Sequence, residues 1–196
     1  TASENLNSII KKIWPENGPA ADEINKYIKK YSKEKIVIKC GGRVLLDPEL
    51  FKHFINDISI LKKLGLTPVI VHGGGPRIKQ KLDDLNIKTD FIMGLRVTNE
   101  KVIKVVEEVM INFNKEIVGA LEKKNCKSKS ITVKENSSIY AEKKNEVLGY
   151  VGKPTKIDDK LIKKIIDENF IPVISPMGMD KEKQTYNINA DTAAGA

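Results

Sequence analysis

The sequence has few of the residues on which several specialised protein classes depend. It contains only two cysteines, Cys40 and Cys126, and no CxxC pair. We therefore expect reduced thiols, with no disulfide framework and no metal held by side chains. No apolar run approaches the ~20 residues that a membrane span needs, and the N-terminus lacks the apolar core of a signal peptide. These absences predict a cytoplasmic protein with no membrane partner.

Arginine is also scarce, although the chain is basic. The formal net charge is +8, but only three of the 34 basic residues are arginines. The lysines alternate with Ile and Asn through amphipathic segments, which is typical of a solvated surface. Regularly spaced aromatic residues, which single-strand binding proteins use as stacking platforms, are missing as well. We expect no nucleic-acid partner, and a Lys-rich nucleic-acid-binding module remains an alternative.

The first 32 residues lie outside the pattern of the rest of the chain. Two sets of apolar residues recur there at helical spacing: Leu6, Ile9, Ile10 and Ile13, then Ile24, Tyr27, Ile28 and Tyr31. Residues 14–19, with two prolines and a glycine, separate the two sets. We predict that residues 1–32 form a helical extension whose apolar face packs on a partner subunit or on the body of the domain.

From residue 33 onward, short β-branched runs alternate with amphipathic helical segments. The expected strands are 35–40, 67–72, 130–133, 138–142, 146–151 and 170–175, and the expected helices are 48–64, 76–85, 99–124 and 158–169. This order is typical of βαβ units. We predict an α/β fold with a largely parallel sheet sandwiched by helices and a β-hairpin inserted near residues 138–151. Residues 33–196 are expected to fill one lobe.

Two glycine clusters follow the first two expected strands. Gly41 and Gly42 come after 35–40, and Gly73–Gly75 come after 67–72. Ligands collect beyond the carboxyl ends of strands in an open α/β sheet, so we expect both loops on one edge, side by side. Glycine lets backbone N–H groups approach an anion, and the helix that begins at Pro76 adds a positive dipole. The two loops predict an anion site, although tight βα turns alone would also explain the glycines.

Neither loop matches a standard nucleotide-binding signature. The sequence contains no GxxxxGK[ST], and Ile78 stands where the third glycine of GxGxxG belongs. A P-loop is therefore excluded, and dinucleotide binding is disfavoured.

Three charged residues extend the predicted anion site. Lys39 ends a buried strand, where an ammonium group is costly unless it meets an anion such as a transferring phosphoryl group. Asp191, in "NINAD", can hold that ammonium in place, and Arg96, in "GLRVT", can bind a carboxylate bidentately. Each also has a purely structural interpretation. Lys39 could simply reach solvent, Asp191 could cap the helix that follows it, and Arg96 could lie on the surface of its strand.

Together these motifs resemble the acetylglutamate kinase family, which has the amino-acid kinase, or carbamate-kinase-like, fold. The resemblance runs from about residue 20 to the C-terminus and rests on "IKCGG", "VIVHGGGP", "GLRVT", "LGYVGKP" and "NINAD", in this order. Cys40 is a mild departure, because the family usually has an apolar or aromatic residue there. The resemblance implies phosphorylation of the side-chain carboxylate of N-acetyl-L-glutamate by ATP with Mg²⁺, in arginine biosynthesis.

The resemblance also implies a role for each matching residue of the phosphoryl path. Lys39 would stabilise the charge on the transferring phosphoryl group, and Asp191 would orient Lys39. The backbones of Gly41, Gly42 and Gly74 would line the path that this group follows.

Other matching residues would bind the amino-acid substrate. Gly74 and Gly75 would hold it, Arg96 would bind its α-carboxylate, and Asn187 would bind its polar end. The product is an acyl phosphate, so both reactants are anionic. A carboxylate nucleophile has no proton to lose, which explains a site built from glycines, Lys and Arg without a general base.

The family has a nucleotide-binding lobe after the "NAD" motif, where this sequence ends. We therefore expect the 196 residues to be a fragment that binds acetylglutamate weakly at best and does not phosphorylate it alone. Arginine-inhibited members carry an N-terminal helix that joins dimers into a hexamer, so we expect a homodimer and, through residues 1–32, a possible hexamer. The alternatives are a carbamate, aspartate, glutamate or uridylate kinase, and a non-catalytic regulatory subunit.

Overall fold

A parallel β-sheet forms the centre of the protein. The computed structural model describes residues 21–32 and 34–196. The strands of this sheet lie in the order β1 (Lys35–Cys40), β2 (Thr67–His72), β8 (Ile171–Ile174) and β5 (Ser128–Ile131). All of their pairings are parallel, and the predicted α/β fold with a largely parallel sheet is confirmed.

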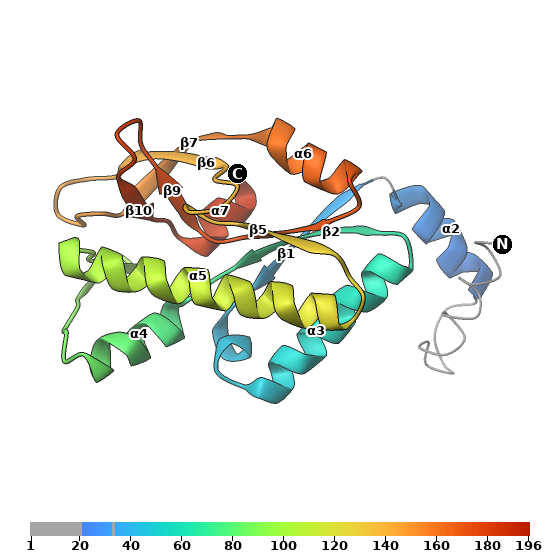
Figure 1. Ribbon diagram of the computed structural model, residues 1–196, viewed down its shortest axis with the longest axis horizontal. Coiled ribbons are helices and arrows are strands. Elements are labelled where there is room, and N and C mark those ends of the chain that lie inside the picture. The colour runs from blue at the N-terminus through green and yellow to red at the C-terminus, as the bar shows by residue number, and fades with distance from the viewer. Residues whose placement is uncertain (1–20, 33) are drawn as a thin grey trace.

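Helices lie on both sides of the parallel sheet. Figure 1 shows α3 (Pro48–Lys63), α4 (Gly75–Asp84) and α5 (Glu100–Lys123) below the sheet, and α6 (Asp159–Asp167) and α7 (Ala190–Gly195) above it. The side chains of β2 alternate between these two sides. Ile70 packs in the core with α3 and α5, whereas Val69 and Val71 pack in the core with α6. Burial on both sides explains why β2 and β8, in the middle of this sheet, are continuous apolar runs. β1, at the edge, is only partly buried, with Val37 50% exposed, so the expectation that Lys39 belongs to a buried strand is wrong.

A second sheet lies on the α6 side of the molecule. Its strands lie in the order β10 (Thr185–Asn187), β9 (Met177–Met179), β6 (Ile139–Lys143) and β7 (Gly152–Ile157). β6 and β7 pair antiparallel, so the predicted hairpin exists. The prediction of a strand at 146–151 is wrong, because residues 146–148 form a turn in which Asn145 accepts a hydrogen bond from the Leu148 N–H (2.9 Å).

Helix α2 (Ala21–Tyr31) contains the second apolar set of the predicted N-terminal extension. Ile28 is buried, whereas Tyr27 is exposed and its ring stacks on that of Tyr31, with centroids 6.5 Å apart. The first apolar set, within 6–13, lies outside the described residues. In the part of the chain that the structure describes, no helix has both the length and the apolar character for crossing a membrane.

A close backbone contact joins the short hairpin of β3 (Phe91–Ile92) and β4 (Leu95–Arg96) to the loop before β7. The Thr98 N–H donates to the Leu148 carbonyl (2.9 Å), and the Tyr150 N–H donates to the Thr98 carbonyl (2.7 Å). Gly149, between them, has φ +68°, and a Cβ there would collide with the Thr98 carbonyl oxygen. Only glycine fits this position without strain.

Gly149→Ala is expected to lower the free energy of unfolding by about 1–3 kcal/mol, the cost of a strained backbone position. Gly119→Ala is the matched control, because a Cβ there, in the C-terminal part of α5, meets no atom within 4 Å. The control should raise the free energy of unfolding by about 0.5–1 kcal/mol through helix propensity. Urea denaturation measures both, and an equal effect of the two substitutions would contradict the packing described.

Candidate active site

The parallel pairing of β1 and β2 brings the two glycine clusters together. Cys40 lies opposite His72 at the carboxyl ends of these strands, and the Gly73 N–H donates to the Cys40 carbonyl (2.7 Å). The first cluster continues into the short 3₁₀ helix η1 (Gly42–Leu45), and the second into α4. The two loops therefore lie side by side on one edge of the sheet, as the sequence predicts.

A pocket of about 490 Å³ lies at this edge. Most residues predicted for the site line it: Lys39, Gly42, Gly74, Gly75, Arg96 and Asn187. Gly41 lies next to the Lys39 stem, since a Cβ at Gly41 would lie 3.3 Å from the Lys39 Cε. The volume falls within the range of roughly 300–1,000 Å³ that is usual for small-molecule sites.

Lys39, which lines this pocket, forms an ion pair with Asp191, which lies just outside its lining. The Lys39 Nζ lies 2.6 Å from an Asp191 carboxylate oxygen, and the two side chains are 41% and 74% exposed. An exposed pair of this kind contributes only about 0–1 kcal/mol to stability, so its main effect is to hold the ammonium in position. The alternative interpretation of Asp191 as the N-cap is wrong, because the Asn189 side chain caps α7 by accepting from the Asp191 and Thr192 N–H groups.

Arg96 enters the pocket from β4 and is buried, so the alternative of a surface arginine is wrong. Its Nη1 donates to the Thr89 hydroxyl (2.8 Å), and its guanidinium lies 4.6 Å from the centre of the Phe91 ring. Burial lowers the pKa of Arg96, and the charge of Asp83 partly opposes this. Among the described carboxylates, none lies within ion-pair distance of Arg96. This guanidinium is therefore available for the carboxylate of a ligand.

Asn187 and Gly74 complete the predicted set of residues that line the pocket. Asn187 ends β10, and its backbone N–H donates to the Tyr150 carbonyl (2.8 Å), which fixes the strand end beside the pocket. Gly74 packs closely over α5, because a Cβ there would lie 2.6 Å from the Met110 sulfur. A side chain at position 74 would displace Met110, which itself lines the pocket.

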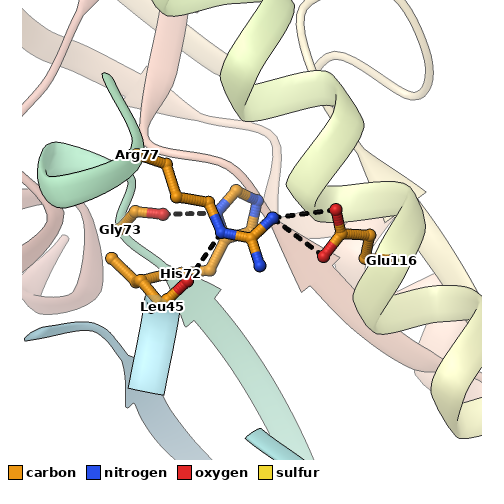
Figure 2. Close-up of polar contacts among 5 residues, drawn as sticks. All are labelled: Leu45, His72, Gly73, Arg77 and Glu116. Carbon is orange, nitrogen blue, oxygen red and sulfur yellow. Dashed lines mark hydrogen bonds and ion pairs between the residues drawn. The ribbon is translucent and has the colours of Figure 1, made fainter. Parts of the chain in front are cut away.

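His72 supports the second glycine loop and is a residue that sequence reasoning missed. Its Nδ1 lies 2.9 Å from the Gly73 carbonyl oxygen (Figure 2), and its Nε2 lies 3.1 Å from the Asn114 amide nitrogen. These distances fit a neutral ring that donates from Nδ1 and accepts at Nε2. The same Asn114 nitrogen donates to the Val173 carbonyl (2.9 Å), which links β2 to β8. The sequence signal that could have identified His72 is a polar residue at the end of the otherwise apolar run "VIVH".

The pKa of His72 predicts a specific pH dependence of stability. Burial lowers this pKa from 6.5 to about 4. Between these two values the unfolded chain binds a proton that the folded chain does not, so stability falls as the pH falls through this window. The loss should amount to about 3 kcal/mol by pH 4.

His72→Gln should therefore show a flatter decrease in the free energy of unfolding between pH 7 and pH 4, measured by urea denaturation. His53→Gln is the matched control, because His53 is the other histidine and is exposed on α3. It should keep the wild-type slope. Parallel curves for the wild type and His72→Gln would contradict a neutral, buried ring.

Comparisons with known proteins agree with this arrangement. The sequence profile of the amino acid kinase family matches residues 34–196. The chain belongs to the amino acid kinase family. Acetylglutamate kinase of Pelagibacter ubique (strain HTCC1062) is 55% identical over 184 residues, which make up 94% of this chain and 64% of that relative. Acetylglutamate kinase of Caldanaerobacter subterraneus subsp. tengcongensis is 45% identical over 86% of this chain and 58% of its own length. The chain thus spans 58–64% of the length of these relatives.

Solved structures show the same fold. The protein smu.665 from Streptococcus mutans UA159 superimposes with a TM-score of 0.73 at 28% identity, over 81% of this chain and 65% of that one. N-acetylglutamate synthase from Neisseria gonorrhoeae, solved with coenzyme A and N-acetyl-glutamate, gives a TM-score of 0.76 at 21% identity, over 88% and 40% of the two chains. Carbamate kinase from Giardia lamblia superimposes with a TM-score of 0.56 at 15% identity, over 82% of this chain and 65% of that one. The predicted carbamate-kinase-like fold is confirmed.

Proposed function

We propose that this chain provides the amino-acid-binding lobe of an acetylglutamate kinase, which transfers a phosphoryl group from ATP to the side-chain carboxylate of N-acetyl-L-glutamate. The observation that carries the proposal is one pocket where two glycine loops, the Lys39–Asp191 pair and the buried Arg96 meet. The two acetylglutamate kinase relatives support the same substrate. The product, N-acetyl-glutamyl phosphate, belongs to arginine biosynthesis, and the proposal includes a cytoplasmic location.

The pocket offers a separate partner for each end of this dianionic substrate. Arg96 binds the α-carboxylate, because it is a buried cation with no ion-pair partner among the described carboxylates. Asn187 binds the polar acetamido end, and Gly74 and Gly75 hold the chain of the substrate between them. The side-chain carboxylate then extends toward Lys39.

Catalysis in this arrangement depends on charge stabilisation and positioning. The Lys39 ammonium and the backbone N–H groups near Gly41, Gly42 and Gly74 balance the charge that spreads over the transferring phosphoryl oxygens. Among the described residues, no cluster of His, Cys, Asp and Glu suits a metal ion. Mg²⁺ would therefore arrive with the phosphates of ATP, as it usually does in kinases.

The matched relatives are longer than this chain, so we propose that ATP binds mainly to a further part of the protein. An "extended chain" provides the test: this chain joined after Ala196 to the part of the Pelagibacter ubique relative that continues beyond the match. The extended chain should form acyl phosphate from N-acetyl-L-glutamate and ATP, trapped as the hydroxamate, whereas the 196-residue chain should not. The added part alone is the control and should be inactive.

Two outcomes of that experiment would contradict the proposal. Robust turnover by the 196-residue chain would show that the further part is not needed. If the extended chain is also assayed by ADP release, turnover of carbamate, aspartate, glutamate or uridylate in preference to N-acetyl-L-glutamate would assign the chain to another branch of the family.

Substitutions in the extended chain should separate binding from transfer. Lys39→Met should lower kcat by about 10²–10³-fold, the usual cost of losing one transition-state donor. Asp191→Asn should lower kcat by less, because the ammonium remains but is no longer held. Arg96→Ala should act mainly by raising KM for N-acetyl-L-glutamate.

Lys104→Met is the control for these substitutions, because Lys104 is exposed on α5 and its ion-pair partner among the described residues is Glu100, one turn away at 3.5 Å. Steady-state kinetics measures all four variants. A wild-type kcat in Lys39→Met would contradict the catalytic role proposed for Lys39.

A further inference from the structure

Arg77, which follows the second glycine loop, connects three elements around the pocket. Its Nε donates to the Leu45 carbonyl (2.7 Å), and its Nη1 lies 2.8 Å from each carboxylate oxygen of Glu116. Figure 2 shows these contacts on one guanidinium group. The same group lies over the Phe113 ring, 4.4 Å from its centre. Arg77 belongs to α4, Leu45 to η1, and the other two residues to α5.

These contacts connect the two glycine loops to each other. Leu45 ends η1, which begins at Gly42, and Arg77 lies in the first turn of α4, which begins at Gly75. The Arg77–Leu45 hydrogen bond therefore joins the segment after one loop to the segment after the other. A guanidinium can donate to a carbonyl and a carboxylate together through its fixed fork, which the ammonium of lysine lacks.

A second chain of contacts reaches the same loop through Phe113. The His72 ring meets the Phe113 ring edge-on, with centroids 5.2 Å apart, and His72 in turn contacts the Gly73 carbonyl. Phe113 is completely buried, so it gives Arg77 and His72 a common, fixed surface. Contacts through His72 and Arg77 thus hold both the Gly73 end of the second loop and the Leu45 end of the first against the same helix, α5.

The energetics indicate a positional role for Arg77. Its side chain is 29% exposed and that of Glu116 is 49% exposed, so their ion pair is worth about 0–1 kcal/mol or little more. Arg77 does not line the pocket, so it does not contact a substrate held there.

We propose that Arg77 is a positioning residue that sets the distance between the two glycine loops for phosphoryl transfer. The inference rests on the proposed function, because phosphoryl transfer depends almost entirely on how the reacting groups and donors are placed. Small displacements of such groups are costly: about 1 Å can reduce the rate by about 10²-fold.

Arg77→Met in the extended chain should lower kcat by about 10- to 100-fold with little change in KM for N-acetyl-L-glutamate. Arg77→Lys should recover only part of the loss, because one ammonium cannot replace the fork. Lys81→Met is the matched control: Lys81 also joins α4 to α5, through Glu108 (3.8 Å), and among the described residues no hydrogen bond joins its side chain to η1. It should keep the wild-type kcat.

Amide hydrogen exchange in the 196-residue chain supplies a readout that does not depend on kinase activity. Arg77→Met should speed exchange at the N–H groups of Leu46 and Asp47, which directly follow η1 and donate to the Arg43 carbonyl inside it (3.2 and 3.1 Å). Exchange in β2 and α5 should stay at the wild-type rate, and Lys81→Met should leave all of these rates unchanged.

The outcomes distinguish this inference from the proposed function. An inactive extended wild-type chain would overturn the proposed function, while faster η1 exchange in Arg77→Met would still support the positional role of Arg77. Wild-type kcat in Arg77→Met would overturn the inference. Faster exchange throughout β2 and α5 would overturn it as well, because Arg77 would then be a general stabilising residue.

Discussion

The parallel register of β1 and β2 is the constraint on which the pocket depends. Because Cys40 lies opposite His72, the chain leaves both strands at the same level, and the Gly73 N–H can bond to the Cys40 carbonyl. A shift of one residue in β1 would turn the Lys39 side chain to the other face of the sheet. The same shift would carry Gly41 away from the second loop.

The groups around the pocket contribute more to geometry than to stability. The Lys39–Asp191 and Arg77–Glu116 pairs are substantially exposed, so neither adds much to the free energy of folding. The buried contacts are different: Asn114 bonds to His72 and to the Val173 carbonyl inside the core. Buried hydrogen bonds thus hold the loop end at Gly73, and the weaker, accessible pair with Asp191 holds the Lys39 ammonium at the pocket.

The parts of the fold that follow local rules could be predicted from the sequence. β1 and β2 were identified as short apolar runs, and Asp47 caps α3 through the Glu49 and Leu50 N–H groups, as its position before Pro48 predicts. The meeting of the two glycine loops followed from local features as well, since glycine clusters after parallel strands meet at one sheet edge. Asn187, by contrast, was assigned only from the family resemblance.

Features that depend on tertiary contacts could not be predicted in the same way. The second hairpin strand begins at Gly152 because Asn145 organises a turn in residues that have strand-like composition. β9 and β10 have three residues each, too few for a periodic signal. The roles of His72 and Arg77 depend on partners 42 and 39 positions away in α5, a relation that no local pattern contains.

A crystal structure of the extended chain with N-acetyl-L-glutamate would test the central claim most directly. We predict that the α-carboxylate lies against the Arg96 guanidinium, and that the side-chain carboxylate lies between Gly42 and Gly74, facing the Lys39 ammonium. A reversed substrate, with its side-chain carboxylate on Arg96, or a substrate bound outside this pocket, would contradict the claim.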